Sequence, residues 1–128
     1  MSEKITSFTK LIAWQKGHQL ILEIYQVTKD FPKEEMFGLI SQLRRAVVSY
    51  TSNIAEGFSR QTYKNKAHFY SISLGSLTEV QNQLLIAKDV GYIEDEKFNE
   101  LASSTVELSK ITNGLIKASR NKINSLNS

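Results

Sequence analysis

Basic and aromatic side chains gather near residue 60, and their types are suited to binding nucleic acid. Arg60, Lys64 and Lys66 fall within seven residues, and Tyr63 and Phe69 are interleaved with them. Basic groups neutralise nucleic-acid phosphates, and aromatic rings stack on unpaired bases. Basic residues at the start of a helix oppose the helix dipole, so helix propensity alone does not favour them there. The cluster therefore predicts a nucleic-acid contact, with solvation of a helix start as the alternative.

Two more arginines, Arg44 and Arg45, precede this cluster, and the charge of the chain changes sign in blocks. Residues 36–78 carry five basic groups and one acidic group, and residues 79–107 carry two basic and seven acidic groups. The last stretch, 108–128, has four basic groups and no acid. Such blocks predict separate positive and negative regions, either for binding or as ordinary solvated faces. We expect Arg44 and Arg45 to join the nucleic-acid contact or to pair with acids across a subunit interface.

The sequence offers little for catalysis or metal binding. It contains no cysteine, and neither His18 nor His68 follows a glutamate by three residues, as a di-metal site in a helical bundle requires. Each predicted helix holds a glutamate whose spacing turns it away from the core: Glu23, Glu56, Glu79 and Glu107. No Gly-rich phosphate loop or nucleophile turn is present. We therefore expect a protein that is not an enzyme and has no metal and no cofactor.

Hydrophobic residues recur every three or four positions in four segments, which predicts helices at about residues 11–30, 34–58, 63–90 and 95–120. The second is the most regular, with predicted core positions Met36, Ile40, Leu43, Val47, Tyr50, Ile54 and Gly57.

Punctuating residues stand between the predicted helices. Pro32 ends the first helix, Ser59 or Thr62 caps the third, and Gly91 closes the third. Gly57 is predicted to take the left-handed conformation at the end of the second helix. We interpret Asn53 and Glu56 as structural groups that bond to the backbone and to neighbouring side chains at that helix end.

Four long helices with short connections predict an all-α, up-down-up-down four-helix bundle. We expect one domain over residues 1–128, with an ordered core at about 11–120 and frayed ends. No apolar run approaches the ~20 residues of a membrane span. The first ten residues, MSEKITSFTK, lack the apolar core of a signal peptide. The expected location is cytoplasmic, with no membrane partner.

Several apolar residues fall outside the predicted core positions. Phe69, Ile72 and Ile86 lie off the core face of the third helix, and Leu20 lies on the flank of the first. A monomer would leave these side chains in water. They therefore predict self-association with Phe69, Ile72 and Ile86 in the interface, whereas merely broad core faces are the alternative.

Short motifs in the chain match a known pattern. They are Trp14-Gln15-Lys16, Gln42-Leu43-Arg44-Arg45-Ala46, Ser49, Asn53-Ile54-Ala55-Glu56-Gly57, Gly75-Ser76-Leu77 with Glu79, and Gly91-Tyr92. Together they resemble the bacterial family of 23S rRNA intervening-sequence proteins over about residues 11–120. The resemblance implies a four-helix bundle that assembles into a homopentamer. That family is also similar to accessory proteins of diversity-generating retroelements, which are basic pentameric bundles that bind nucleic acid and a reverse transcriptase.

These observations favour an oligomeric accessory protein that binds RNA or DNA with low specificity, through electrostatic contact with the backbone. The alternative is a protein-interaction scaffold that holds a partner protein and makes no contact with nucleic acid. Salt-dependent binding to generic RNA distinguishes the two functions, because only the first depends on phosphate contacts.

Overall fold

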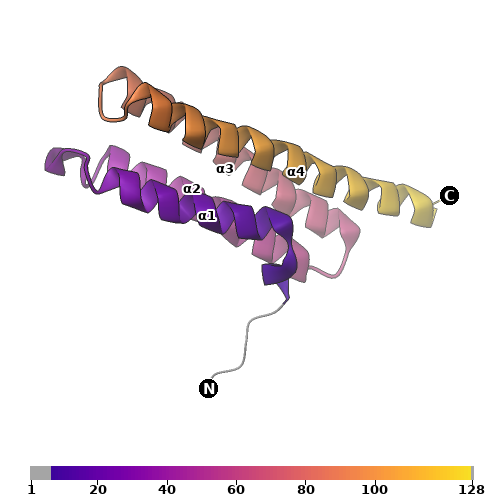
Figure 1. Ribbon diagram of the computed structural model, residues 1–128. Helices are drawn as coiled ribbons and strands as arrows, with labels where there is room; N and C mark the ends of the chain where they lie inside the picture. Colours follow the sequence, from indigo (N-terminus) through magenta and orange to yellow (C-terminus); the bar gives the residue numbers. More distant parts are fainter. Residues whose placement is uncertain (1–6, 128) are drawn as a thin grey trace.

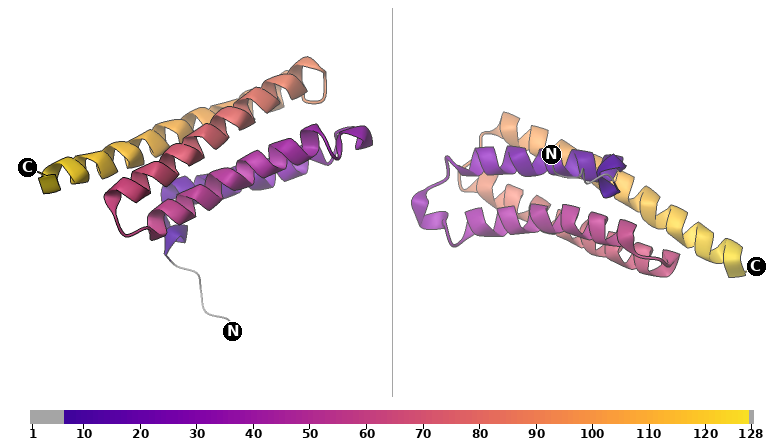
Figure 2. Two further views of the ribbon diagram at one scale, coloured as in Figure 1. Left: turned by 180° about the vertical axis from the view of Figure 1, so that it is seen from behind. Right: turned by 90° about the horizontal axis from the view of Figure 1, so that it is seen from below.

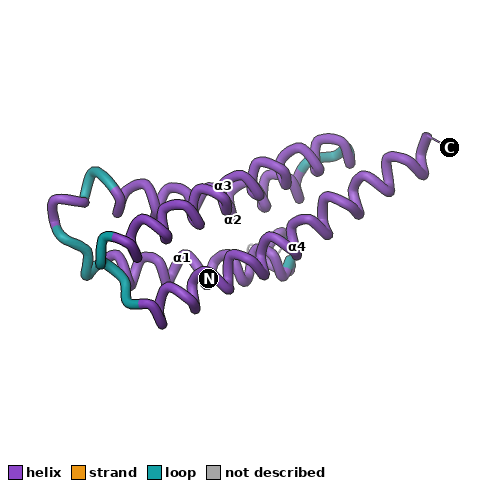
Figure 3. The backbone as a smooth tube through the Cα atoms, turned by 90° about the horizontal axis from the view of Figure 1, so that it is seen from above, coloured by secondary structure: helices purple, strands orange, loops and turns teal. Residues whose placement is uncertain are grey.

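The computed structural model describes residues 7–127, which contain four long α-helices and two short 3₁₀ helices (Figure 1). The elements are η1 (Phe8–Lys10), α1 (Ile12–Thr28), η2 (Lys33–Glu35), α2 (Leu39–Ser59), α3 (Tyr63–Asp89) and α4 (Asp95–Asn127). No strand occurs in this described part of the chain, and short connections join the helices (Figure 3). The prediction of an all-α protein with four long helices is confirmed. Residues 1–6 and Ser128, which belong to the predicted frayed ends, lie outside the described residues.

Each long helix packs against two others. α2 lies between α1 and α3, and α4 lies beside α3 and α1. The backbones of α1 and α3, and those of α2 and α4, do not come close together, although the side chains of Tyr50 and Thr112 meet between α2 and α4. The buried hydrophobic residues form one cluster to which all four helices contribute. The C-terminal part of α4 projects beyond the ends of the other helices (Figure 2). No helix within residues 7–127 has the length and apolar content needed to cross a membrane.

The core face of α2 agrees with the sequence pattern, whereas α1 and α3 deviate from it. The predicted core positions between Ile40 and Gly57 are all buried, but Met36 precedes α2 and is 48% exposed. Leu20, expected on the flank of α1, is fully buried. The buried face of α1 contains Leu20, whereas Trp14 is only partly buried beside the core, with its ring 5.5 Å from the Phe8 ring of η1. Tyr63, expected in the core, is the first residue of α3 and stays partly exposed at the end of the bundle.

Gly57 does not end α2, so its predicted left-handed conformation is wrong. The helix continues to Ser59, and Gly91, with φ of 86°, is the one described residue with a positive φ. A Cβ atom at Gly57 would lie 2.7 Å from Cε1 of Tyr70 and 3.3 Å from the carbonyl oxygen of Lys66. The glycine is needed because α2 and α3 approach closely at this point. Gly91 does close α3, as predicted.

The helix ends depend on short side-chain contacts. Thr62 caps α3, since its Oγ1 accepts a hydrogen bond from the Asn65 amide at 3.1 Å. α2 begins later than predicted, at Leu39, and the Glu35 carboxylate accepts a hydrogen bond from that amide at 3.2 Å. α4 continues past its predicted end at Arg120 to Asn127, with no Gly or Pro in this stretch to stop it.

Candidate nucleic-acid interface

A layer of polar contacts crosses the bundle near its middle. The hydroxyl groups of Tyr50 and Thr112 are hydrogen-bonded at 2.8 Å, and Ser73 Oγ donates to the Tyr50 carbonyl at 2.9 Å. Gly17 of α1 faces the Tyr50 ring. These contacts bring residues 17, 50, 73 and 112 of the four helices to the same level. Burial raises the pKa of the Tyr50 hydroxyl to about 12, although its hydrogen bond with Thr112 opposes this shift.

The parts of the molecule on the two sides of this polar layer differ strongly in charge. Residues 7–17, 50–73 and 112–127, which we call the basic end, carry eight basic groups and one acidic group. Residues 18–49 and 74–111, the acidic end, carry seven basic and eleven acidic groups. The start of α1, the α2–α3 connection and the end of α4 lie together at the basic end (Figures 1 and 2). Folding thus separates charges that the sequence distributes in several blocks.

Arg60 lies at the basic end but already has partners in the chain. Its Nε is 3.2 Å from a carboxylate oxygen of Glu56, and its guanidinium lies 4.5 Å from the centre of the Phe69 ring. The ring of Phe69 also contacts His68 edge to face, at 5.3 Å. The positive charge of Arg60 is therefore partly compensated, and Phe69 is covered on one face.

Lys66 also has a partner in the chain, whereas Lys64 has none among the described residues. Lys66 Nζ donates to the Phe58 carbonyl at 2.5 Å, near the C-terminal end of α2, where a cation stabilises the helix dipole. Lys64 is exposed and has no hydrogen-bond or ion-pair partner among residues 7–127. Of the three predicted residues, Lys64 is the one whose charge is most available to a ligand. A role for all three in nucleic-acid binding stays a prediction.

The end of α4 supplies basic side chains that sequence reasoning did not single out. Lys117, Arg120 and Lys122 are exposed on this projecting segment, and within the described chain none of them pairs with an acid. Glu107 is the last acidic residue of the sequence, and it forms an ion pair with Lys16 of α1. The signal in the sequence was the absence of any acid after residue 107.

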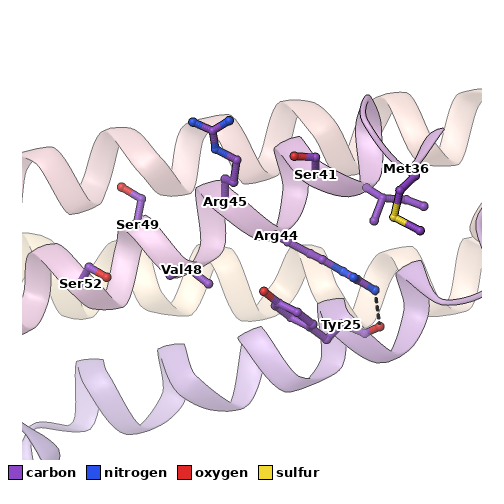
Figure 4. Close-up of a pocket in the computed structure, with 9 residues that line it drawn as sticks. Tyr25, Met36, Ser41, Arg44, Arg45, Val48, Ser49 and Ser52 are labelled. Atoms are coloured by element: carbon purple, nitrogen blue, oxygen red, sulfur yellow. Dashed lines mark hydrogen bonds between the residues drawn. The ribbon is translucent and has the colours of Figure 1, made fainter.

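Arg44 is fixed against α1. Its Nε donates to Thr28 Oγ1 at 2.9 Å, its Nη2 donates to the Tyr25 carbonyl at 3.4 Å, and its guanidinium lies 4.5 Å from the centre of the Tyr25 ring. The next residue, Arg45, is exposed, and its side chain extends away from Tyr25 (Figure 4). Neither arginine pairs with an acid in the described part of the chain. The two adjacent arginines therefore lie in different environments, one fixed against α1 and one exposed.

Both arginines line a groove of about 530 Å³ between α1 and α2 (Figure 4). Its lining combines apolar side chains with hydroxyl groups and the two guanidinium groups: Tyr25, Met36, Ile40, Ser41, Arg44, Arg45, Val48, Ser49 and Ser52. A concave site with an apolar wall and a few polar groups is the usual form of a small-ligand site.

The motif at Asn53, Glu56 and Gly57 makes contacts inside the chain. Asn53 Nδ2 donates to the Ser49 carbonyl at 2.9 Å, and Glu56 pairs with Arg60. These contacts support a structural interpretation of the motif.

Other motif residues lie between α2 and α3. The hydroxyl groups of Ser49 and Ser76 are hydrogen-bonded at 2.9 Å. A groove of about 320 Å³ here is lined by Gln42, Arg45, Ala46, Ser49, Ser76, Glu79 and Gln83. Within the described residues, Oε1 of Gln83 is buried without a hydrogen-bond partner. Motif residues of α2 thus face motif residues of α3 across this groove: Gln42, Arg45, Ala46 and Ser49 on α2, and Ser76 and Glu79 on α3.

The predicted interface residues lie on α3. Ile72 and Ile86 are 39% and 43% exposed, and Phe69 is half-buried beneath Arg60. Self-association through these residues stays a prediction. Among residues 7–127, no three His, Cys, Asp or Glu side chains are grouped so that they could hold a metal ion.

A model of the family described as 23S rRNA-intervening sequence protein matches residues 9–114. No curated protein matches the chain. A crystal structure from Bacteroides thetaiotaomicron, described as a protein with unknown function from the S23 ribosomal protein family, is similar with a TM-score of 0.77. The alignment covers 83% of this chain and 99% of that chain, at 20% sequence identity. At this identity the likeness concerns the fold.

Proposed function

Because the chain belongs to the family of 23S rRNA-intervening sequence proteins, we propose that it is a non-enzymatic accessory protein that binds RNA with low sequence specificity. We also propose that the helices form an up-down-up-down bundle and that the bundle assembles into a homopentamer, as the family resemblance implies. The observation that carries the RNA-binding proposal is the basic end, with its eight basic groups and one acid.

The expected contacts are electrostatic. Six basic side chains of the basic end have no acidic partner among the described residues, and one of them, Lys66, is bonded to the Phe58 carbonyl. The other five are exposed and available for phosphate contacts: Lys10, Lys64, Lys117, Arg120 and Lys122. Each phosphate that a side chain neutralises releases counterions, with a contribution of about −0.7 to the slope of log K against log salt for a single strand. Five contacts give a slope of about −3.5, which is roughly a 100-fold loss of affinity between about 50 and 200 mM salt. Phosphate contacts carry no sequence information, so specificity is low.

Assembly strengthens such contacts. In a ring of identical subunits the basic end is repeated by symmetry, so one RNA strand that spans two subunits binds the second site at a high effective concentration. We expect dissociation constants for a single site in the micromolar range that is typical of non-specific contacts.

A charge-reversal experiment tests the proposal. The variant Lys64→Glu/Lys117→Glu/Lys122→Glu changes the basic end, and the control Lys29→Glu/Lys33→Glu/Lys97→Glu makes the same change in net charge at the acidic end. Binding of labelled single-stranded RNA is measured by fluorescence anisotropy at low salt, and circular dichroism verifies the helical content. We expect the first variant to lose most of its affinity and the control to lose little. Equal losses in both would mean that net charge, and not the basic end, governs binding.

A second function is favoured by the apolar side chains of the acidic end. Phe37 is 96% exposed in the connection before α2, and Val90 is 55% exposed at the end of α3. These connections lie at the same end of the bundle (Figure 1). Exposed apolar side chains of this size are typical of protein contacts, so a scaffold that binds a partner protein is the alternative. Absence of RNA binding even at low salt would favour the scaffold.

A further inference from the structure

We propose that the groove between α1 and α2 binds one unpaired nucleotide of single-stranded RNA, with its base stacked on Arg44 and its phosphate on Arg45. This inference rests on the proposed function, since it assigns a base-binding site to a chain that we propose binds RNA. All of the lining residues except Ser52 belong to the acidic end, and the basic side chains of the basic end do not line the groove, so its contribution is separate from theirs. Its residues come from α1, from the segment before α2 and from α2 itself (Figure 4).

Hydrogen bonds to α1 fix the orientation of the Arg44 guanidinium. Nε and Nη2 donate inward, to Thr28 Oγ1 at 2.9 Å and to the Tyr25 carbonyl at 3.4 Å. The Cζ atom of the guanidinium lies over the Tyr25 ring, 4.5 Å from the centre of the ring. Arg44 also lines the groove, and we assign the side of the guanidinium remote from Tyr25 to the ligand. The inward hydrogen bonds fix this plane before any ligand binds.

This orientation selects the kind of ligand. A carboxylate or phosphate binds arginine best at the edge of the guanidinium, through two parallel hydrogen bonds. At Arg44 part of this edge already donates to α1. A flat, positively charged face is suited instead to stacking, and proteins do stack unpaired RNA bases on arginine planes. The arrangement would be a three-layer stack of the Tyr25 ring, the guanidinium and the base.

The remaining lining of the groove fits a nucleotide. Met36 and Val48 supply apolar surface and are 48% and 38% exposed, so they are accessible to a base. Ser41 and Ser52 add hydroxyl groups that can bond to ribose or to a base edge. The volume of about 530 Å³ lies within the range of small-molecule sites. No side chain is fixed to read one particular base, so the site would tolerate all four.

Arg45 provides the phosphate contact. It follows Arg44 directly, its side chain is exposed on the rim of the groove, and it has no acidic partner among the described residues. Its guanidinium edge is therefore free for phosphate oxygens. Stacking and phosphate contact are thus assigned to different residues, so they can be separated experimentally.

The experiment compares a single-stranded RNA with a strand of the same length in which the bases are removed. Both strands carry the same phosphates, so their affinity ratio reports base contacts alone. For the native protein we expect the intact strand to bind roughly tenfold more tightly, as stacking of one base allows. Arg44→Lys keeps the charge and loses the plane, so its ratio should fall to about one while the salt slope stays unchanged. Arg45→Gln should keep the ratio and reduce the slope by about one phosphate contact.

A second pair of variants tests the groove without changing Arg44, whose replacement could also disturb the fold. Val48→Glu places a carboxylate in the groove at an exposed position, and Val106→Glu makes the same change on α4, where Val106 is 47% exposed and lies outside this groove. We expect the base-dependent ratio to fall for Val48→Glu and to persist for Val106→Glu. A ratio that persists in both Arg44→Lys and Val48→Glu would overturn the site. Equal affinity of the native protein for both strands would overturn the stacking site and leave the proposed function intact, whereas no binding of either strand would overturn both.

Discussion

Gly17 lets α1 approach α2 closely, and its replacement by alanine tests the packing of this interface. A Cβ atom at this position would lie 2.6 Å from Cε2 of Tyr50 and 2.8 Å from Cγ2 of Thr51. Carbon atoms that are not bonded prefer about 3.5–4.0 Å. The Tyr50 ring cannot move aside easily, because it is fully buried and its hydroxyl is bonded to Thr112. Alanine at position 17 therefore forces α1 away from α2.

Two opposing effects determine the change in stability of Gly17→Ala. Alanine is favoured over glycine inside a helix by about 1 kcal/mol. An extra methyl group in a well-packed core typically costs about 1–3 kcal/mol. We place Gly17→Ala near the upper end of this cost, because the overlap involves a ring with no free space. The net loss is then about 1–2 kcal/mol, which lowers the melting temperature of a domain of this size by roughly 3–10 °C.

Urea unfolding followed by circular dichroism measures the effect, at one fixed protein concentration because association alters apparent stability. Gly75→Ala and Gly114→Ala are matched controls, since a Cβ atom at either site has no neighbour within 4 Å. We expect both controls to gain roughly 0.5–1 kcal/mol from helix propensity. If Gly17→Ala were as stable as these controls, α1 and α2 would not be packed as described.

Three other predictions concern the motif, the polar layer and assembly. Gly57→Val should lower the melting temperature, because a Cβ atom there would lie 2.7 Å from the Tyr70 ring; unchanged stability with loss of RNA binding would make the motif a recognition site. The unfolded state loses the Tyr50 proton near pH 10, whereas the pKa of Tyr50 in the folded protein is about 12. Stability should therefore fall by up to about 2–3 kcal/mol as the pH rises from 10 to 12, and urea midpoints for Tyr50→Phe should lack this part of the decline. Light scattering should give a mass near five chains, with smaller species for Ile72→Glu, and a native protein that stays monomeric at micromolar concentration would contradict assembly.

The helices could be predicted because each buries one continuous face. The three-to-four spacing of apolar residues from Ile40 to Ile54 leaves little choice of secondary structure or core positions in α2. The error at Leu20 arose because the width and exact direction of a core face depend on the neighbouring helices. The conformation of Gly57 could not be predicted for a similar reason, since a glycine near a helix end suits both a left-handed turn and a close helix contact. The choice between them depends on Tyr70, which is brought there by the tertiary fold.

The candidate sites could be predicted only in part. The cluster at Arg60, Lys64 and Lys66 is visible in the sequence because its members are neighbours along the chain. The contribution of α4 is not visible, because it depends on which end of the bundle holds the C-terminal segment. The contact of Arg44 with Tyr25 spans nineteen residues and two helices, so local patterns do not reveal it.

The salt dependence of RNA binding tests the central claim most directly. Dissociation constants for a generic single-stranded RNA are measured between about 50 and 200 mM salt for the native protein and for the Lys64→Glu/Lys117→Glu/Lys122→Glu variant. We expect a slope of log K against log salt of about −3.5 or steeper for the native protein, and a much shallower slope for the variant. Native binding that does not change with salt, or a slope that survives the triple reversal, would contradict the claim that the basic end binds RNA phosphates.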